Sequence, residues 1–313
     1  MTRPDGYDRC NRFTTIIVDE ALRRGLDVEV LDPELGELRI GDGRREEVVI
    51  QSLSQRLPAV SYFRCEHKVA SRRVLSAAGL PLPAGHVIAD DATDETFLRQ
   101  HGTVVVKPAR GEGGEGVTVG VADVAGLQEA VEVARRHHET VLAEEMVEGE
   151  DLRVLVIDGS VVAASVRRPP VVVGDGTRTV GQLAEALNAE RRGQEGAVEV
   201  PLDDRTLDVL AGQGATLDDV LDDGRRVVLR RTANVHTGGT ITDVTDRLHP
   251  SSVETACRAA GAVSAPLLGV DLIVPDVEGD GGVIIEVNPM PGLANHEPQP
   301  TAQRYLDMLF GAE

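Results

Sequence analysis

Three oxygen-bearing side chains occupy two neighbouring apolar segments late in the sequence. Asp271 lies within Val270–Val274, and Glu286 lies within Val283–Val287, with Asn288 two residues after Glu286. The β-branched residues predict two strands, and the Pro, Asp and Gly residues between them predict a hairpin turn. Because side chains alternate along a strand, Glu286 and Asn288 share a face, and antiparallel pairing can bring Asp271 onto it. These oxygen atoms suit an Mg²⁺ ion that also binds substrate phosphates. The alternative interpretation is a solvent-exposed hairpin face that carries acidic residues without a metal.

The rarity of lysine is the second feature that indicates a functional site. Of 32 basic residues only Lys68 and Lys107 are lysines, and the other 30 are arginines. A lysine ammonium is a compact point charge on a flexible stem, whereas arginine presents a wide planar fork. A site built around a point contact to phosphate would keep lysine, so we expect both residues to be phosphate ligands.

The composition disfavours several classes of function. The formal net charge of −20 and an aromatic content of 2% disfavour general binding to nucleic acid or anionic membranes. No apolar run approaches the roughly 18 residues of a membrane helix, and the first residues lack the apolar core of a signal peptide. We therefore expect a cytoplasmic protein. Cys10, Cys65 and Cys257 lack metal-type spacing and are predicted to be structural thiols.

The two lysines belong to different predicted elements. Residues 66–78 have helical apolar spacing and place Lys68 in the first turn, beside free backbone N–H groups. Residues 103–108 form a predicted strand that ends at Lys107 and leads into a glycine-rich loop. Its glycines are Gly111, Gly113, Gly114 and Gly116. A dinucleotide-binding loop needs a helix after the glycines, but a predicted strand follows, and no Lys-Ser or Lys-Thr completes a Walker A loop. The loop is predicted to be a hairpin tip whose N–H groups cover phosphates.

The remaining pattern predicts a mixed α and β protein. In a small N-terminal α/β lobe, Thr15–Val18 leads into a helix that ends at Gly25, and further strands follow. Those strands are predicted at 28–31, 38–40 and 48–50. After the glycine loop, a helix is predicted at 125–140 and strands at 141–147, 153–157 and 161–166. A polar helical insertion at about 174–226, a strand at 227–230 and a helix at 253–265 follow.

Taken in order, five segments resemble the ATP-grasp ligases. They are the helix with Lys68, VVVKP with its glycine loop, LAEEMVEGED, LRRTANVHTGG, and GVDLIV through IIEVNPMPGL. Together they cover nearly the whole chain. The resemblance is closest to the ATP-grasp parts of cyanophycin synthetase, bifunctional glutathione synthetase and N-acetylglutaminylglutamine synthetase.

The resemblance implies a role for each matching residue. Lys68, Lys107 and the loop Gly111–Gly116 would bind the phosphates of ATP. Glu144, with the backbone around Met146 and Val147, would meet the adenine, and Asp151 would meet the ribose. Asp271, Glu286 and Asn288 would hold Mg²⁺, with Mn²⁺ as an alternative. Arg153, Arg167, Arg230 and Asn234 would hold the γ-phosphate, the acyl phosphate or a substrate carboxylate.

The resemblance also implies an α+β ATP-grasp fold, in which two lobes grip ATP behind the small N-terminal lobe. The expected divisions are residues 1–62, 63–145 and 146–313. The implied activity is ATP-dependent joining of an amino-acid or small-peptide carboxylate to an amine, through an acyl phosphate. Alternatives are an inactive ATP-binding regulatory module and a ligase with a different acceptor. The implied partners are small molecules, and relatives are often homodimers or homotetramers.

Overall fold

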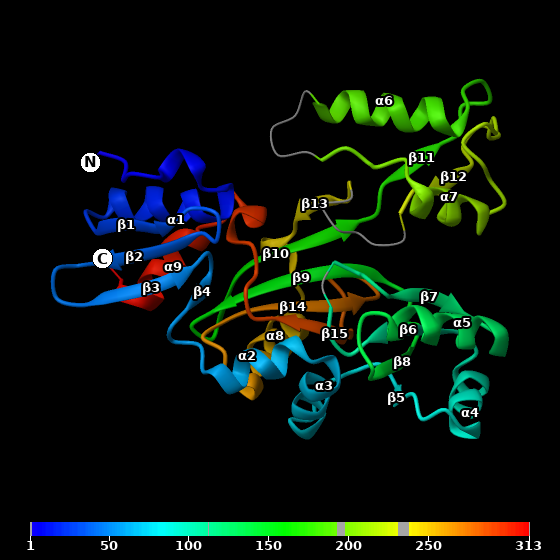
Figure 1. The fold of residues 1–313 in the computed structure, drawn as a ribbon, viewed down its shortest axis with the longest axis horizontal. Helices are drawn as coiled ribbons and strands as arrows, with labels where there is room; N and C mark the ends of the chain where they lie inside the picture. The colour runs from blue at the N-terminus through cyan, green and yellow to red at the C-terminus, as the bar shows by residue number, and fades with distance from the viewer. Residues whose placement is uncertain (1, 112, 193–197, 231–237, 313) are drawn as a thin grey trace. The chain divides into compact units, whose positions relative to one another are not determined.

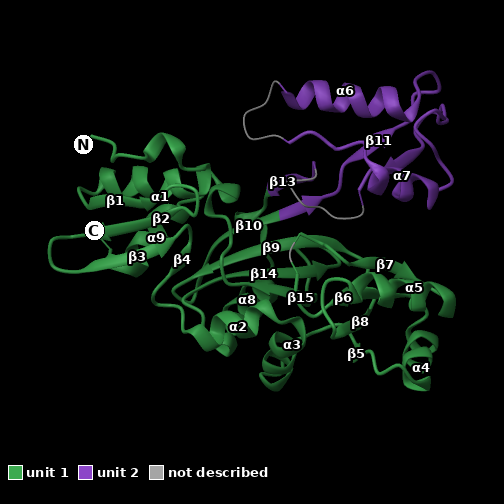
Figure 2. Ribbon diagram, in the orientation of Figure 1, with its two compact units in different colours: residues 1–165, 243–313 green, residues 166–242 purple. Residues whose placement is uncertain are grey.

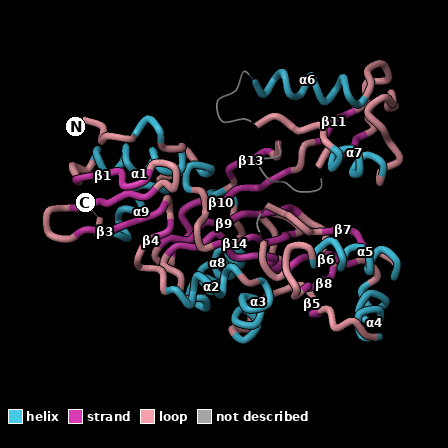
Figure 3. Tube along the Cα trace, viewed as in Figure 1, coloured by secondary structure: helices cyan, strands magenta, loops and turns pink. Residues whose placement is uncertain are grey.

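The computed structural model describes residues 2–111, 113–192, 198–230 and 238–312 (Figure 1). The chain divides into two compact units, residues 1–165 with 243–313 and residues 166–242 (Figure 2). Helices and strands of both units are distinguished in Figure 3. None of the helices within these described ranges combines the length and apolar character that crossing a membrane requires.

Unit 1 begins with a helix and a small antiparallel sheet. The helix α1 (Arg12–Arg23) starts earlier than predicted because the side chain of Asn11 accepts the N–H of Thr14 at 3.1 Å and caps its first turn. The strands follow in the order β1-β2-β3-β4. Their bounds are β1 (Asp27–Asp32), β2 (Glu37–Gly41), β3 (Glu46–Ile50) and β4 (Leu53–Ser54). The predicted hairpin is confirmed, since Leu38 is opposite Val49.

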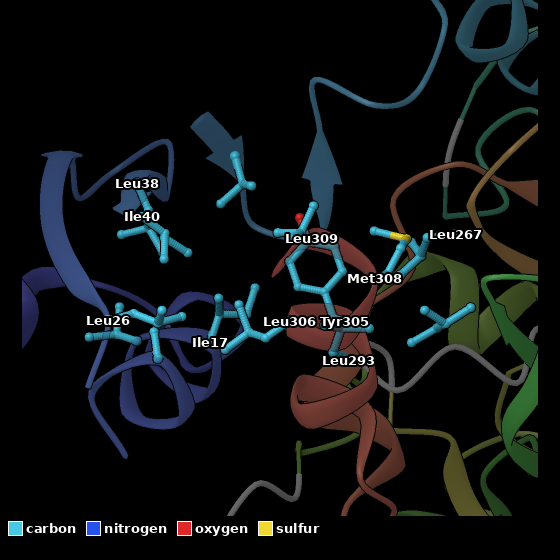
Figure 4. Close-up of a cluster of buried hydrophobic side chains, with 14 of the residues drawn as sticks. Ile17, Leu26, Leu38, Ile40, Leu267, Leu293, Tyr305, Leu306, Met308 and Leu309 are labelled. Atoms are coloured by element: carbon cyan, nitrogen blue, oxygen red, sulfur yellow. The ribbon is translucent and has the colours of Figure 1, made fainter. Parts of the chain in front are cut away.

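One apolar cluster joins this sheet to the last helix of the chain. The helix α9 (Thr301–Phe310) contributes Tyr305 and Leu306, which lie among side chains of α1 and β2 (Figure 4). Ile17 and Leu38 are fully buried in the same cluster. The N-terminal sheet therefore buries its apolar face against residues from the far end of the sequence.

A second sheet carries Lys107 and the glycine loop. Its strand order is β5-β8-β6-β7. The strands are β5 (Gly85–Val87), β6 (Val104–Pro108), β7 (Thr118–Val121) and β8 (Val141–Glu145), and the nearby helices are α4 (Ala92–His101) and α5 (Val124–Arg135). The strands β6 and β7 pair antiparallel, so the glycine loop is a hairpin connection between strands, as predicted.

A third sheet carries the predicted metal ligands. Its order is β13-β10-β9-β14-β15. The strands are β9 (Glu150–Ile157), β10 (Ser160–Arg168), β13 (Thr240–Asp243), β14 (Leu267–Val274) and β15 (Val283–Asn288), and the helix α8 (Pro250–Val263) packs on β9 and β14. The helices α2 (Ala59–Glu66) and α3 (Lys68–Ala77) contact β15. The helix predicted at 66–78 starts at Lys68, because His67 is extended (φ −118°, ψ 100°) and separates α2 from α3.

Unit 2 has its own apolar core. The strands β11 (Val171–Val173) and β12 (Arg226–Val228) pair antiparallel, and α6 (Val180–Arg192) and α7 (Asp204–Ala211) lie within the predicted helical insertion. Val180, Leu210 and Leu229 are among the buried residues of this core. The three-part division at residues 62 and 145 stays a prediction.

Candidate functional site

The predicted metal ligands are brought together by strand register. Asp271 on β14 is directly opposite Glu286 on β15, and Gly269 is opposite Asn288. Directly opposed residues of an antiparallel pair project from the same face, and positions two apart return to it. The amide Nδ2 of Asn288 donates to Oδ2 of Asp271 at 3.2 Å, so the side-chain oxygen of Asn288 is the amide atom left for a cation. The sharing of one face by Asp271, Glu286 and Asn288 is confirmed.

Asp271 has a cationic neighbour on the other side. It is 2% exposed, and β9 places Arg153 directly opposite it. The guanidinium Nη2 of Arg153 donates to Oδ2 of Asp271 at 3.0 Å, and its Nε donates to Oδ1. A buried carboxylate needs such a partner, because removing an unpaired charge from water costs several kcal/mol. Arg153 therefore balances the charge of Asp271.

Lys68 connects Glu286 to the glycine loop. Its Nζ lies 2.9 Å from Oε1 of Glu286 and donates to the carbonyl of Gly111, also at 2.9 Å. The backbone N–H of Lys68 donates to the carbonyl of Ala109 at 2.8 Å. The first turn of α3 is thereby tied to both β15 and the loop after β6.

The glycine loop has a backbone that ordinary residues rarely adopt. Gly111, Gly113, Gly114 and Gly116 have φ of 135°, 64°, 81° and 69°. L-residues with side chains are disfavoured in this region, so the glycines are explained by backbone conformation. A loop of this kind exposes backbone N–H groups, which can bind an anion.

Lys107 is a buried cation shared between two sheets. Its Nζ forms an ion pair with Oε2 of Glu144 on the neighbouring strand β8 and donates to the carbonyl of Ile285 on β15 at 3.1 Å. Lys107 and Glu144 are 7% and 6% exposed. The two lysines, which the sequence singles out by their rarity, thus both reach β15.

Sequence reasoning missed Arg72. It lies one helical turn after Lys68 on α3, and its Nη1 donates to Oε1 of Glu144 at 2.9 Å. A pocket lies between α3, β8 and β15. The residues that line it are Lys68, Ser71, Arg72, Leu75, Leu82, Glu144, Ile284, Ile285 and Glu286. The spacing of four residues from Lys68 puts Arg72 on the same helix face and is the signal that could have indicated it.

Three residues predicted to contact the adenine or the ribose lie just after β8 or at the start of β9. Met146 is partly exposed, and its N–H donates to the carbonyl of Thr103 at 3.1 Å. Val147 is half-buried. Asp151 is opposite Ile273 on β14, two positions from the pair of Asp271 with Arg153, and therefore on the same face. Their roles toward a nucleotide stay predictions.

Three of the predicted anion-binding residues belong to unit 2. Arg230 is 5% exposed; its Nη2 lies 2.8 Å from Oδ2 of Asp203 and donates to the carbonyl of Pro201 at 3.1 Å. Its guanidinium holds the pKa of Asp203 below the ordinary value. Arg167 lies near the end of β10, and Asn234 lies outside the described residues.

The donor set fits a hard cation held jointly with a ligand. Within the described part of the chain, no three His, Cys, Asp or Glu side chains form a metal-binding group. Asp271 and Glu286 supply two carboxylates and Asn288 an amide oxygen. Mg²⁺ is usually bound by one or two carboxylates and completes its shell with water and phosphate oxygens. Three oxygen donors are too few to enclose a metal ion by themselves, but they suit an Mg²⁺ ion that is also bound by water and phosphate oxygens.

The three cysteines are free thiols. Burial raises the pKa of Cys65 to about 12, and burial also raises the pKa of Cys10 and Cys257. Because the thiolate is the reactive form, a raised pKa makes these thiols less reactive than an ordinary cysteine.

Comparison with known proteins identifies the family. The family model of the ATP-grasp domain matches residues 65–292. This range includes both lysines, the glycine loop, and the strands β14 and β15 that carry the predicted metal ligands. The chain belongs to the ATP-grasp family. The predicted α+β ATP-grasp fold is confirmed, and α1 with the β1–β4 sheet precedes the matched region.

Named ATP-grasp relatives are longer than this chain. Cyanophycin synthetase from Nostoc sp. is 32% identical over 96% of the chain, which spans 35% of that protein. The glutathione biosynthesis bifunctional protein from Clostridium perfringens is 28% identical over 97% of the chain, which spans 42% of it. The chain thus spans less than half the length of these relatives.

Solved structures show the same ATP-grasp architecture. A bifunctional glutathione synthetase from Pasteurella multocida superimposes with a TM-score of 0.68 and 26% identity over 97% of this chain and 44% of that one. A D-alanine–D-alanine ligase from Bacillus anthracis has a TM-score of 0.50 at 17% identity, over 80% and 67% of the two chains, which shows a shared fold alone.

Proposed function

We propose that this chain is an ATP- and Mg²⁺-dependent ligase that joins the carboxylate of an amino acid or small peptide to an amine and releases ADP and phosphate. One observation carries the proposal. Lys68 and Lys107, the only lysines of the chain, both reach the strand that bears Glu286. Membership of the ATP-grasp family and similarity to cyanophycin synthetase and glutathione synthetase support the same activity.

The proposed reaction has two displacements. A substrate carboxylate oxygen attacks the γ-phosphorus of ATP, the bond from phosphorus to the β,γ-bridging oxygen breaks, and ADP leaves. The amine then attacks the acyl carbon, a C–N bond forms, and the C–O bond to phosphate breaks. The amine gives up a proton as the amide forms. Neither step needs a covalent bond to the protein, so its part is to position and neutralise anions.

The side chains described above suit that task. Lys68 and Lys107 would bind ATP phosphates, and the N–H groups of the loop Gly111–Gly116 would cover them. Asp271, Glu286 and Asn288 would hold Mg²⁺, which supplies charge neutralisation at the phosphates when bound. If Mg²⁺ took the place of Lys68 as the partner of Glu286, the ammonium of Lys68 would be free to bind a phosphate.

The other predicted residues contact the rest of the substrates. Glu144, Met146 and Val147 would adjoin the adenine, and Asp151 the ribose. Arg153, Arg167, Arg230 and Asn234 would hold the transferred phosphate or a substrate carboxylate. For Arg230, deep burial of its guanidinium supports a role in binding an anion.

Release of ADP tests the proposal. The purified chain is incubated with ATP, MgCl₂ and pools of amino acids, γ-glutamyl dipeptides or N-acylated amino acids. We expect ADP only when a pool supplies both a carboxylate and an amine. Binding of ATP without ADP release from any pool would instead indicate a regulatory module. ADP release that depends on bicarbonate would indicate a different acceptor.

Two further properties belong to this proposal. The oxygen donors support Mg²⁺ as the working ion with Mn²⁺ as a substitute, and titrating each ion against ADP release would compare them. We also infer a cytoplasmic protein that acts on small molecules as a homodimer or homotetramer, and light scattering on the purified protein would test the oligomeric state.

A further inference from the structure

Glu144 is a buried carboxylate that two cations neutralise from different elements. Its Oε2 is paired with Lys107 on β6, and its Oε1 accepts from Nη1 of Arg72 on α3 at 2.9 Å. Glu144 is 6% exposed, so water does little to stabilise its charge. In the described part of the chain, these are the cations at ion-pair distance from Glu144.

The proposed function asks one of these cations to serve a second anion. Lys107 would bind a nucleotide phosphate, and a single ammonium then divides its attraction between that phosphate and Glu144. If Lys107 were the only partner of Glu144, moving it would leave a buried charge unbalanced, which is strongly unfavourable. Arg72 is the partner that remains, because α3 holds it on the opposite carboxylate oxygen.

The space for Arg72 is built into β5. Gly85 is directly opposite Glu144 in the pairing of β5 with β8. A Cβ atom at Gly85 would lie 2.4 Å from Cζ and 2.5 Å from Nε of Arg72. Gly85 is not among the glycines with positive φ, so its backbone conformation does not require glycine. Room for the guanidinium explains it instead.

We propose that Arg72 is a positioning residue for ATP. It fixes Glu144 and balances its charge when Lys107 turns to the nucleotide, and Gly85 provides the room for this arrangement. The inference rests on the proposed nucleotide site, and it assigns to Arg72 and Gly85 a role in setting the affinity for ATP.

Calorimetric titration with Mg·ATP tests the role of Arg72. Arg72→Gln should weaken binding about tenfold, because Lys107 then stays with Glu144. Arg72→Lys should recover part of the loss, since it keeps a cation on the same turn. Arg73→Gln removes an exposed arginine from the next position of α3 and should bind like wild type. In the ADP-release assay, KM for ATP should rise more than kcat falls.

A double-mutant cycle tests the geometry. Gly85→Ala should weaken ATP binding as Arg72→Gln does, and the double variant should bind no more weakly than either single variant. Equal ATP affinity of Arg72→Gln and Arg73→Gln would overturn the proposal, and so would additive losses in the cycle. Circular dichroism checks folding, and if Arg72→Gln does not fold, Arg72→Lys and Gly85→Ala carry the test.

This outcome is separable from that of the proposed function. The binding readout needs ATP and Mg²⁺ but no second substrate. A wild type that binds ATP and releases no ADP would defeat the ligase proposal and still allow the cycle. Conversely, an active ligase in which Arg72→Gln leaves ATP affinity unchanged would defeat this inference alone.

Discussion

Two cross-strand ion pairs in unit 1 have the same local geometry and different surroundings. Arg39 on β2 is opposite Glu29 on β1, and Arg153 on β9 is opposite Asp271 on β14. Both guanidinium groups are hydrogen-bonded to the opposing carboxylate. In the first pair the side chains are 41% and 60% exposed, and in the second they are 16% and 3% exposed.

The two pairs differ in the free energy that their charges lose on removal from water. An exposed ion pair gains little over two solvated charges, whereas a buried pair must offset the loss of water around both ions. The exposed pair of Arg39 with Glu29 therefore contributes little to stability. The pair of Arg153 with Asp271 must instead offset the desolvation of two buried charges.

The largest expected effect comes from breaking the buried pair. Arg153→Gln removes the guanidinium that pairs with buried Asp271 and should lower the free energy of unfolding by about 3 kcal/mol. Urea denaturation followed by circular dichroism measures this change. A loss as small as that of an exposed pair would show that the burial of Asp271 does not govern its energetics.

The partly exposed carboxylate of the same face should separate activity from stability. Glu286→Gln removes one charged oxygen ligand and should lower kcat by about a hundredfold or more. Its side chain is 35% exposed and pairs with Lys68, so the unfolding midpoint should change little. Normal turnover in this variant would contradict the metal assignment.

Lys107 tests whether the type of cation matters as well as its charge. Lys107→Arg keeps the charge but places a wider group in a 7% exposed position between Glu144 and Ile285. ATP binding measured by calorimetry should weaken about tenfold. Unchanged affinity would remove the argument from the rarity of lysine.

The smallest expected effect belongs to the exposed pair. Arg39→Gln should change the free energy of unfolding by no more than about 0.5 kcal/mol, and high salt should reduce the difference further. The same urea titration as for Arg153→Gln gives the comparison directly. A large loss here would mean that cross-strand geometry, and not burial, sets the value of both pairs.

The strands, and the face that their polar side chains share, could be predicted because local patterns determine them. β-branched runs around Asp271 and Glu286 predict strands, and alternation then decides which side chains share a face. The glycine loop could be recognised as a hairpin since a strand, and not a helix, follows Gly116. In each case the decisive information lies within a few neighbouring residues.

Contacts between distant elements could not be predicted in this way. Arg72 and Arg73 are adjacent arginines on one helix, and only a contact with Glu144, 72 positions away, distinguishes them. The break at His67 is likewise invisible to apolar periodicity, which runs on from Glu66 into α3. Apolar spacing indicates that a helix buries one face, but it does not say which strands will cover that face.

The shared core of α1, β2 and α9 has a consequence for synthesis on the ribosome. The helix α9 follows every other helix and strand that the structure describes, so the β1–β4 sheet emerges long before its covering side chains exist. Unit 2, in contrast, is one continuous stretch of chain with an apolar core of its own. The β1–β4 sheet, although it is made before unit 2, cannot reach its native packing until α9 has been made.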